Sequence, residues 1–206
     1  MQPLVCFGGT FNPVHVGHLI VARSVAEQLG ANRVVLIPAA IPPHKARPGA
    51  AAEDRLEMLR LAVAGEELFE VDSLELERPG PSYTIDTLGA LRRRHGSDAE
   101  LVWVIGLDML AELPGWHRAA EVIAEARIIT AARPPMPQDL EERLAGLGRA
   151  FGEEQARRLR AGMLATPLID VSATEIRQRV RHGRSVRYLV PDAVADYIQR
   201  HGLYRE

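Results

Sequence analysis

The chain has 206 residues, of which 47% are hydrophobic and 25% are charged, which is the composition of one ordinary globular domain. The formal net charge of -2 argues against a protein that lives on the phosphates of long nucleic acids, because such proteins are usually strongly basic. Cys6 is the single cysteine, which excludes an intrachain disulfide and a multi-cysteine metal site.

Targeting and membrane segments are not evident. The start, Met-Gln-Pro, carries no basic segment followed by a long apolar stretch, and charged residues interrupt every apolar run. We therefore expect no secretory signal, no membrane span and a cytoplasmic location.

Short apolar runs that fit buried strands alternate with helical patterns along the chain. The alternation predicts an α/β fold, a Rossmann-like doubly wound parallel sheet with helices on both faces. We expect one domain over 1–206, with a small helical subdomain from about 172 to 206, and we interpret Cys6 as a buried strand residue. The charged segment 138–160 either caps the fold or forms a lid. Strands are expected at 4–7, 33–37, 69–76, 101–105, 127–131 and 168–171, and helices at 17–29, 53–64, 84–94, 116–126, 138–160, 172–181 and 191–201.

The strongest motif is segment 8–18, GGTFNPVHVGH, between the first expected strand and the first expected helix. Gly8 and Gly9 allow a tight turn and a close approach of the backbone to a ligand. The helix start offers N–H groups and the positive end of the dipole to a phosphate. His15 and His18 are three residues apart, so near a helix start they face the same side. Together these groups suit a polyphosphate whose charge shifts during a reaction.

Other interpretations of this segment are weaker. It lacks the GxxxxGK(S/T) pattern of a P-loop, and its glycine spacing does not match a dinucleotide fingerprint. A zinc site would need more ligands than His15 and His18. The remaining alternative is a glycine-rich turn with two surface histidines.

A second motif, VSATEIR, occupies segment 171–177. Ser172 and Glu175 have the spacing of a capping box, so a well-capped helix is the simplest interpretation of the segment by itself. Arg177 lies one turn into that helix, where it can carry a fixed charge.

Both motifs resemble signatures of the HxGH nucleotidyltransferase superfamily, GGxFxPxHxGH and (I/V)S(S/A)TxIR. The resemblance implies that His15, His18 and Arg177 are catalytic. Segment 8–18 departs from many bacterial members at Asn12, where they have Asp; we expect the change to be tolerated because it keeps a turn-forming side chain. The implied ATP-binding residues are Gly8, Gly9, Thr10, Phe11, His15, His18, Gly106, Asp108, Ser172, Thr174 and Arg177.

Three middle segments bear on the acceptor. Segments 42–45 (PPHK), 81–88 (PSYTIDTL) and 105–116 (IGLDMLAELPGW) resemble the corresponding segments of bacterial nicotinate-nucleotide adenylyltransferases. Some relatives carry Asn where this chain has Ala39 and Ala40, so one side-chain contact to the acceptor is expected to be missing. The implied acceptor-binding residues are His44, Lys45, Tyr83, Thr84, Trp116 and Arg133.

The chemistry of these residues agrees with the resemblance, although each has an alternative interpretation. Trp116 can stack on a pyridine ring or anchor the core, and Tyr83 and Thr84 stand at a helix start that can receive a carboxylate. Asp108 can hold a ribose hydroxyl or the adenine amine, or simply cap a helix. His44 and Lys45 reach a phosphate or form a solvated basic loop. The histidines outside the signatures, interpreted as surface or structural residues, are His95, His117, His182 and His201.

The reaction implied is adenylyl transfer, in which the 5′-phosphate of nicotinate mononucleotide attacks the α-phosphorus of ATP and pyrophosphate leaves. Mg²⁺ would be held mainly by the ATP phosphates, and no protein nucleophile or general base is required. The alternatives are the same chemistry on nicotinamide mononucleotide or pantetheine phosphate, and a nucleotide-binding regulator without catalysis. The sequence does not determine whether the chain is a monomer or a homo-oligomer.

Overall fold

The computed structural model describes residues 2–42, 49–132 and 136–205 of the chain. Its centre is one parallel sheet with the strand order β3-β2-β1-β4-β5-β6. β1 lies between β2 and β4, so that Cys6 is in register with Val35 on one side and with Trp103 on the other. This strand order is that of a doubly wound sheet, which confirms the predicted fold class. The strands are β1 (Leu4–Gly9), β2 (Val34–Pro38), β3 (Phe69–Val71), β4 (Leu101–Gly106), β5 (Arg127–Ala132) and β6 (Met163–Ala165).

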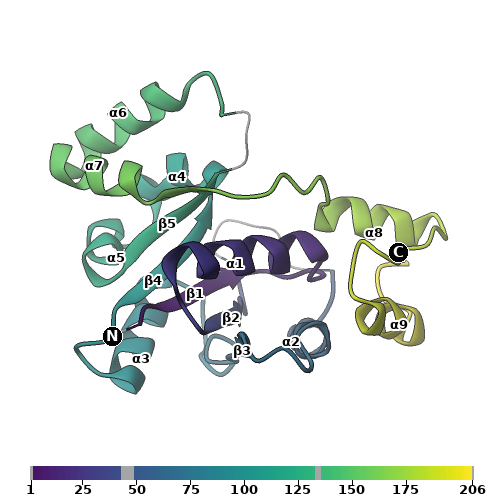
Figure 1. Ribbon diagram of the computed structural model, residues 1–206. Helices are drawn as coiled ribbons and strands as arrows, with labels where there is room; N and C mark the ends of the chain where they lie inside the picture. The colour runs from purple at the N-terminus through teal and green to yellow at the C-terminus, as the bar shows by residue number, and fades with distance from the viewer. Residues whose placement is uncertain (1, 43–48, 133–135, 206) are drawn as a thin grey trace.

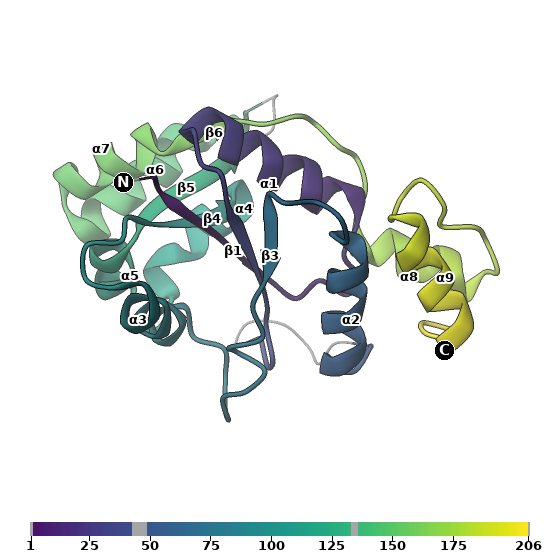
Figure 2. The same cartoon turned by 60° about the horizontal axis from the view of Figure 1, so that its bottom comes forward.

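Helices cover both faces of the sheet (Figure 2). Successive strand residues point to opposite faces, so Val5 packs with α1 and α2, whereas Leu4 and Cys6 pack on the other face with α3 to α7. A core therefore lies on each side of the sheet, which explains why the strands are almost wholly apolar. The helices are α1 (Val16–Leu29), α2 (Ala52–Ala62), α3 (Thr84–His95), α4 (Leu107–Glu112), α5 (Ala119–Glu125), α6 (Leu140–Phe151), α7 (Glu153–Ala161), α8 (Ala173–Arg181) and α9 (Asp192–His201), with a 3₁₀ turn η1 (Leu113–Gly115).

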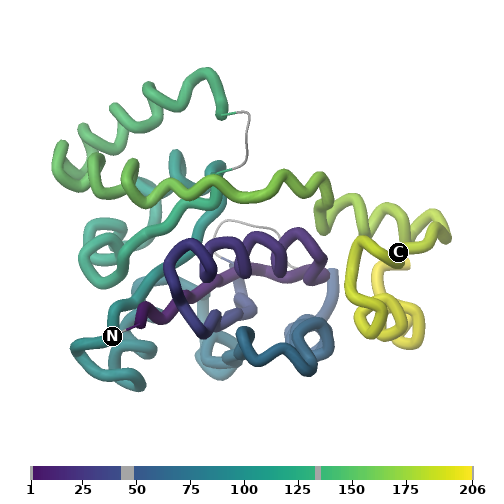
Figure 3. Tube along the Cα trace, viewed as in Figure 1, coloured from purple at the N-terminus to yellow at the C-terminus, as the bar shows by residue number. Residues whose placement is uncertain are grey.

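The last two helices stand beside the sheet at the amino-terminal start of α1 (Figure 1). The chain leaves β6, runs along α1 and reaches α8, a path that is followed most easily in the tube of Figure 3. Gln28 of α1 fixes the start of that path, because its Nε2 donates to the carbonyl of Ala165 at 3.0 Å. The hydroxyl of Tyr197 on α9 donates to Asp54 of α2 at 2.9 Å, so α9 is fastened to α2.

Two of the expected strands differ from the structure. The strand expected at 69–76 ends at Val71, because the Asp72 carboxylate accepts from the Leu74 backbone N–H and turns the chain. The strand expected at 168–171 is not formed, and Leu168 is exposed to solvent. The edge strand is instead β6, aligned by a hydrogen bond of 2.9 Å from the N–H of Thr130 to the carbonyl of Gly162.

Helix boundaries also differ from expectation in the second half of the chain. The helix expected over 138–160 is two helices, α6 and α7, separated at Gly152, which has a φ of 86°. The helix expected from 116 begins at Ala119, because Arg118 has a left-handed φ of 54°. α4 is absent from the helices expected by range, although the alternative interpretation of Asp108 as a cap implied a helix start here. Among the helices within the described residues, none combines the length and apolar character that crossing a bilayer requires.

Cys6 is fully buried in β1, as predicted, and burial raises the pKa of its thiol to about 12. An unfolded chain has a cysteine pKa of about 8.5. We therefore expect Ellman's reagent at pH 8 to label the folded protein about a hundredfold more slowly than the chain unfolded in guanidinium. Labelling of the folded protein at the rate of the unfolded chain would contradict the burial of β1, and a Cys6→Ser variant gives the background.

Candidate active site

The candidate site lies where the carboxyl ends of β1 and β4 meet. These strands are neighbours in the sheet, and the chain leaves them toward opposite edges, which makes their carboxyl ends the topological switch point. The first motif follows β1 and opens α1, and Gly106 ends β4 and opens α4. Two helix N-termini are thereby brought to one edge of the sheet.

The two histidines of the first motif lie against each other at the start of α1. His15 is the N-cap residue, and its backbone N–H donates to Nδ1 of His18 at 3.2 Å. The two rings stack with their centroids 3.7 Å apart. Because Nδ1 of His18 accepts this hydrogen bond, the proton of the neutral His18 ring is on Nε2.

Aromatic rings and one glycine fix this arrangement. The ring of Phe11 meets His18 edge-on, with centroids 5.1 Å apart, and the buried Phe11 has a φ of 46°. A Cβ on Gly17 would stand 3.0 Å from Nδ1 of His15, closer than ordinary packing allows. The glycine of the HxGH signature therefore leaves space for the first histidine ring, which would have to shift if this position carried a Cβ.

The second motif contacts the first in space, although the two lie near opposite ends of the sequence. Ser172 caps α8, as predicted, by accepting from the Glu175 backbone N–H at 3.1 Å. Nη1 of Arg177 donates to the backbone carbonyl of Asn12 at 2.8 Å, and its Nη2 donates to Oγ1 of Thr174 at 3.1 Å. The arginine of one signature is therefore anchored on the loop of the other.

Asn12 also contacts Tyr204, which lies near the C-terminus of the chain. The hydroxyl of Tyr204, which is buried, donates to Oδ1 of Asn12 at 2.8 Å. Burial raises the pKa of the Tyr204 hydroxyl, so it stays protonated and remains a donor. The Asn12 amide supplies the oxygen that this hydroxyl needs, as the carboxylate of an Asp at this position also would.

At the end of β4, the N-cap of α4 is Gly106 and not Asp108. The alternative interpretation of Asp108 as a helix cap is therefore wrong. Asp108 lies exposed in the first turn of α4. A Cβ on Gly106 would stand 2.5 Å from Oδ1 of Asp108, so the glycine leaves room for this carboxylate.

The segment expected to receive the acceptor forms the start of α3. Tyr83 is the N-cap residue and Thr84 the first helical residue. The Tyr83 ring lies against that of the exposed His117, with centroids 4.2 Å apart, which agrees with the interpretation of His117 as a surface or structural residue. Trp116 follows η1, half-buried and packed against the core on the α3 side, and its Nε1 has no hydrogen-bond partner among the described residues. His44, Lys45 and Arg133 lie outside the described residues.

Arg55 is a buried residue that the sequence analysis did not select. Its Nη1 donates to the carbonyl of Thr10 at 2.7 Å and its Nη2 to the carbonyl of Ala40 at 3.4 Å. Desolvation lowers the pKa of its guanidinium. One signal was present in the sequence: Arg55 stands three and four residues before Met58 and Leu59, on the apolar stripe of its helix.

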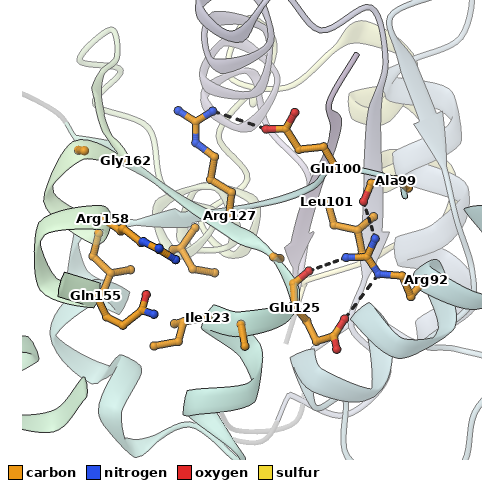
Figure 4. A pocket seen from close by; sticks show the side chains of 15 residues that line it. Arg92, Ala99, Glu100, Leu101, Ile123, Glu125, Arg127, Gln155, Arg158 and Gly162 are labelled. Atoms are coloured by element: carbon orange, nitrogen blue, oxygen red, sulfur yellow. Dashed lines mark hydrogen bonds and ion pairs between the residues drawn. The ribbon is translucent and has the colours of Figure 1, made fainter. Parts of the chain in front are cut away.

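Within 2–42, 49–132 and 136–205, no group of three or more His, Cys, Asp or Glu side chains is arranged to hold a metal ion. A hollow of about 450 Å³ lies elsewhere, at the amino ends of β4 and β5 (Figure 4). Its arginines are already engaged: Arg92 donates to the carbonyls of Ala99 and Glu125, Arg127 pairs with Glu100, and Arg158 pairs with Glu154. The hollow is at the opposite end of these strands from the residues of the two motifs.

Comparisons with known proteins agree with this geometry. A family model described as cytidylyltransferase-like matches residues 6–179. The chain is 45% identical to a "Probable nicotinate-nucleotide adenylyltransferase" of Thermomicrobium roseum over 100% of this chain and 92% of the relative. It is 48% identical to a protein of the same name from Pseudomonas putida, over 96% of this chain and 93% of that protein. The structure of Plasmodium falciparum nicotinic acid mononucleotide adenylyltransferase complexed with NaAD matches with a TM-score of 0.76 and 14% identity, over 99% of this chain and 98% of that one.

The fold and the two signature motifs agree with a nucleotidyltransferase, and the chain belongs to the cytidylyltransferase-like family. Within that family, its full-length relatives place it among the nicotinate-nucleotide adenylyltransferases.

Replacing Arg55 tests whether the buried guanidinium holds the Thr10 and Ala40 loops together. Arg55→Met keeps the length of the side chain but leaves two backbone carbonyls without their donor, so we expect the free energy of unfolding to fall by about 1–3 kcal/mol. Arg60→Met, on the exposed side of the same helix, should change it by less than about 0.5 kcal/mol. Equal denaturant midpoints for the two variants would contradict the assignment.

Proposed function

We propose that this chain transfers the adenylyl group of ATP to nicotinate mononucleotide, giving deamido-NAD and pyrophosphate in the cytoplasmic synthesis of NAD. The observation that carries the proposal is the hydrogen bond between Arg177 and the Asn12 carbonyl, because it joins two phosphate motifs that are far apart in the sequence. The relatives, of the same name and nearly the same length, support the acceptor.

The triphosphate of ATP would lie between the starts of α1 and α8. The His18 Nε2–H would donate to an α-phosphate oxygen, where charge shifts during the reaction, and His15 would act on the neighbouring phosphates. Arg177, with Ser172 and Thr174, would hold the β- and γ-phosphates that leave as pyrophosphate. Backbone N–H groups of segment 8–11 would complete the cradle.

The reaction needs positioning and charge stabilisation more than proton transfer. The acceptor phosphate is already an anion at neutral pH and attacks the α-phosphorus in line with the departing pyrophosphate. Mg²⁺ would accompany ATP, held mainly by the ATP phosphates, and would supply positive charge that neutralises part of theirs. The described residues of the site therefore orient the two substrates and stabilise the transition state.

The acceptor would occupy the space between α3 and the end of β4. N–H groups at the start of α3, beside Tyr83 and Thr84, would receive the pyridine carboxylate. The half-buried Trp116 would offer the ring a stacking surface. His44, Lys45 and Arg133 would contact the acceptor phosphate, and Gly106 and Asp108 the adenosine. The complex of the Plasmodium falciparum protein with NaAD supports a product of this kind.

A parallel assay of acceptors tests the proposal. Pyrophosphate release from ATP and Mg²⁺ is measured with nicotinate mononucleotide, nicotinamide mononucleotide and pantetheine phosphate. A charged hydrogen-bonded group is worth about 1.5–3 kcal/mol, so we expect kcat/KM to be about ten- to a hundredfold higher for the nicotinate form than for the amide. Turnover of another acceptor alone would overturn the acceptor assignment, and no release with any acceptor would favour a nucleotide-binding regulator.

Alanine variants test the assigned phosphate contacts. His18→Ala and Arg177→Ala each remove a positioned donor for the transition state, so we expect kcat to fall about 10²- to 10³-fold in each. His182→Ala, at the exposed C-cap of α8, is the control and should keep turnover within about twofold. Near-normal turnover by His18→Ala would exclude its contact with the α-phosphate.

A further inference from the structure

Glu75 is a buried carboxyl group in the connector between β3 and α3, a segment with no regular strand or helix. Only 5% of the residue is exposed. Burial raises the pKa of the carboxyl group, and hydrogen bonds from Thr87 and Ser82, with the charge on Arg78, act in the opposite direction. A carboxyl group in this position is costly to bury unless its oxygens are hydrogen-bonded, so its partners indicate what it does.

Both hydroxyl partners of Glu75 belong to the segment expected to receive the acceptor. Oγ1 of Thr87, one turn into α3 and fully buried, donates to Oε1 of Glu75 at 2.5 Å. The Ser82 hydroxyl accepts from the backbone N–H of Ala40 at 2.9 Å, and its hydrogen bond with the Glu75 carboxyl group is one of the interactions that lower the pKa of Glu75. Glu75 thus holds the residues on both sides of Tyr83 and Thr84.

The same contacts continue to the ATP loop. The Ala40 peptide that donates to Ser82 accepts from Arg55 through its carbonyl, and Arg55 also donates to the carbonyl of Thr10. The order of contacts is Glu75, Ser82, Ala40, Arg55 and Thr10. A single, partly buried chain of polar contacts therefore connects the acceptor segment with the first motif.

We propose that Glu75 is a positioning residue that fixes the Ser82–Thr84 turn and the start of α3 in the shape that receives the acceptor. The inference rests on the proposed function, because it concerns the acceptor of that reaction. Two hydroxyl donors converge on Glu75, and a carboxyl group has two oxygens to receive them, whereas an amide has only one. The chemical class that this turn receives is the anionic ring substituent of the acceptor, so loss of Glu75 should weaken acceptor binding selectively.

A second buried carboxylate in the same connector has contacts of another kind. Asp72 is similarly buried, accepts from the Leu74 N–H at 3.0 Å and pairs with Arg94 near the end of α3. Neither partner belongs to the acceptor segment. Asp72 is therefore the matched control, since its loss disturbs the connector without touching the Ser82–Thr84 turn.

The test compares Glu75→Ala, Glu75→Gln and Asp72→Asn with the unaltered chain in steady-state pyrophosphate release and in thermal unfolding. For Glu75→Ala we expect KM for nicotinate mononucleotide to rise at least about tenfold, while KM for ATP and kcat change by less than about threefold. Glu75→Gln keeps one acceptor oxygen and should recover part of the loss. Asp72→Asn should lower the Tm without changing the ratio of the two KM values.

The proposal is overturned if the Glu75 variants raise both KM values by the same factor, if they leave KM for the acceptor unchanged, or if Asp72→Asn changes the ratio equally. Should Glu75→Ala not fold, the nearly isosteric Glu75→Gln still gives the ratio. Failure of the proposed function has a different signature: the unaltered chain itself would not use nicotinate mononucleotide. The ratio is then measured with the acceptor that it does use.

Discussion

The hydrogen bond from Arg177 to the carbonyl of Asn12 is the contact on which the site depends. β1 lies in the middle of the sheet, so the loop after it is the meeting point for segments that arrive from both sides. α8 reaches that loop only after the chain has completed the sheet and passed along α1. Tyr204 then binds the side chain of the same Asn12, which ties the end of the chain to the first loop. The charge of Arg177 is thereby fixed before any substrate binds, the condition under which a charged group stabilises a transition state most effectively.

Buried polar groups hold the remaining loops in place. Arg55 and Glu75 lose solvation by burial and gain hydrogen bonds in return, mainly to backbone carbonyls and hydroxyl groups. Hydrophobic residues of similar size could fill such positions without the cost of desolvation. The polar groups instead fix the direction of backbone segments that have no regular secondary structure of their own. The sheet itself is apolar, and the hydrogen bonds of Arg55 and Glu75 at its edge hold the loops where substrates are expected to bind.

The sequence predicted the parallel sheet, because the apolar runs of β1, β2, β4 and β5 are buried on both faces and cannot be mistaken for amphipathic segments. It also placed the two motifs at helix starts, because the glycines of segment 8–18 and the capping-box spacing of Ser172 and Glu175 are local signals. It placed the edge strand wrongly, since β6 is three residues long and is selected by pairing with β5, a tertiary contact. Arg55 and Glu75 were not selected because a buried polar residue is defined by partners distant in sequence. The structure brings together the first loop and Arg177 but leaves the acceptor and ATP contacts as proposals.

The most direct test of the account is the crystal structure of the protein with Mg²⁺ and a non-hydrolysable ATP analogue. The account predicts that the triphosphate bridges the two motifs, with His18 at the α-phosphate and Arg177 at the β- and γ-phosphates. It would be contradicted by a nucleotide that contacts one motif without the other, or that binds in the hollow beside Arg92 and Arg127 at the opposite end of β4 and β5.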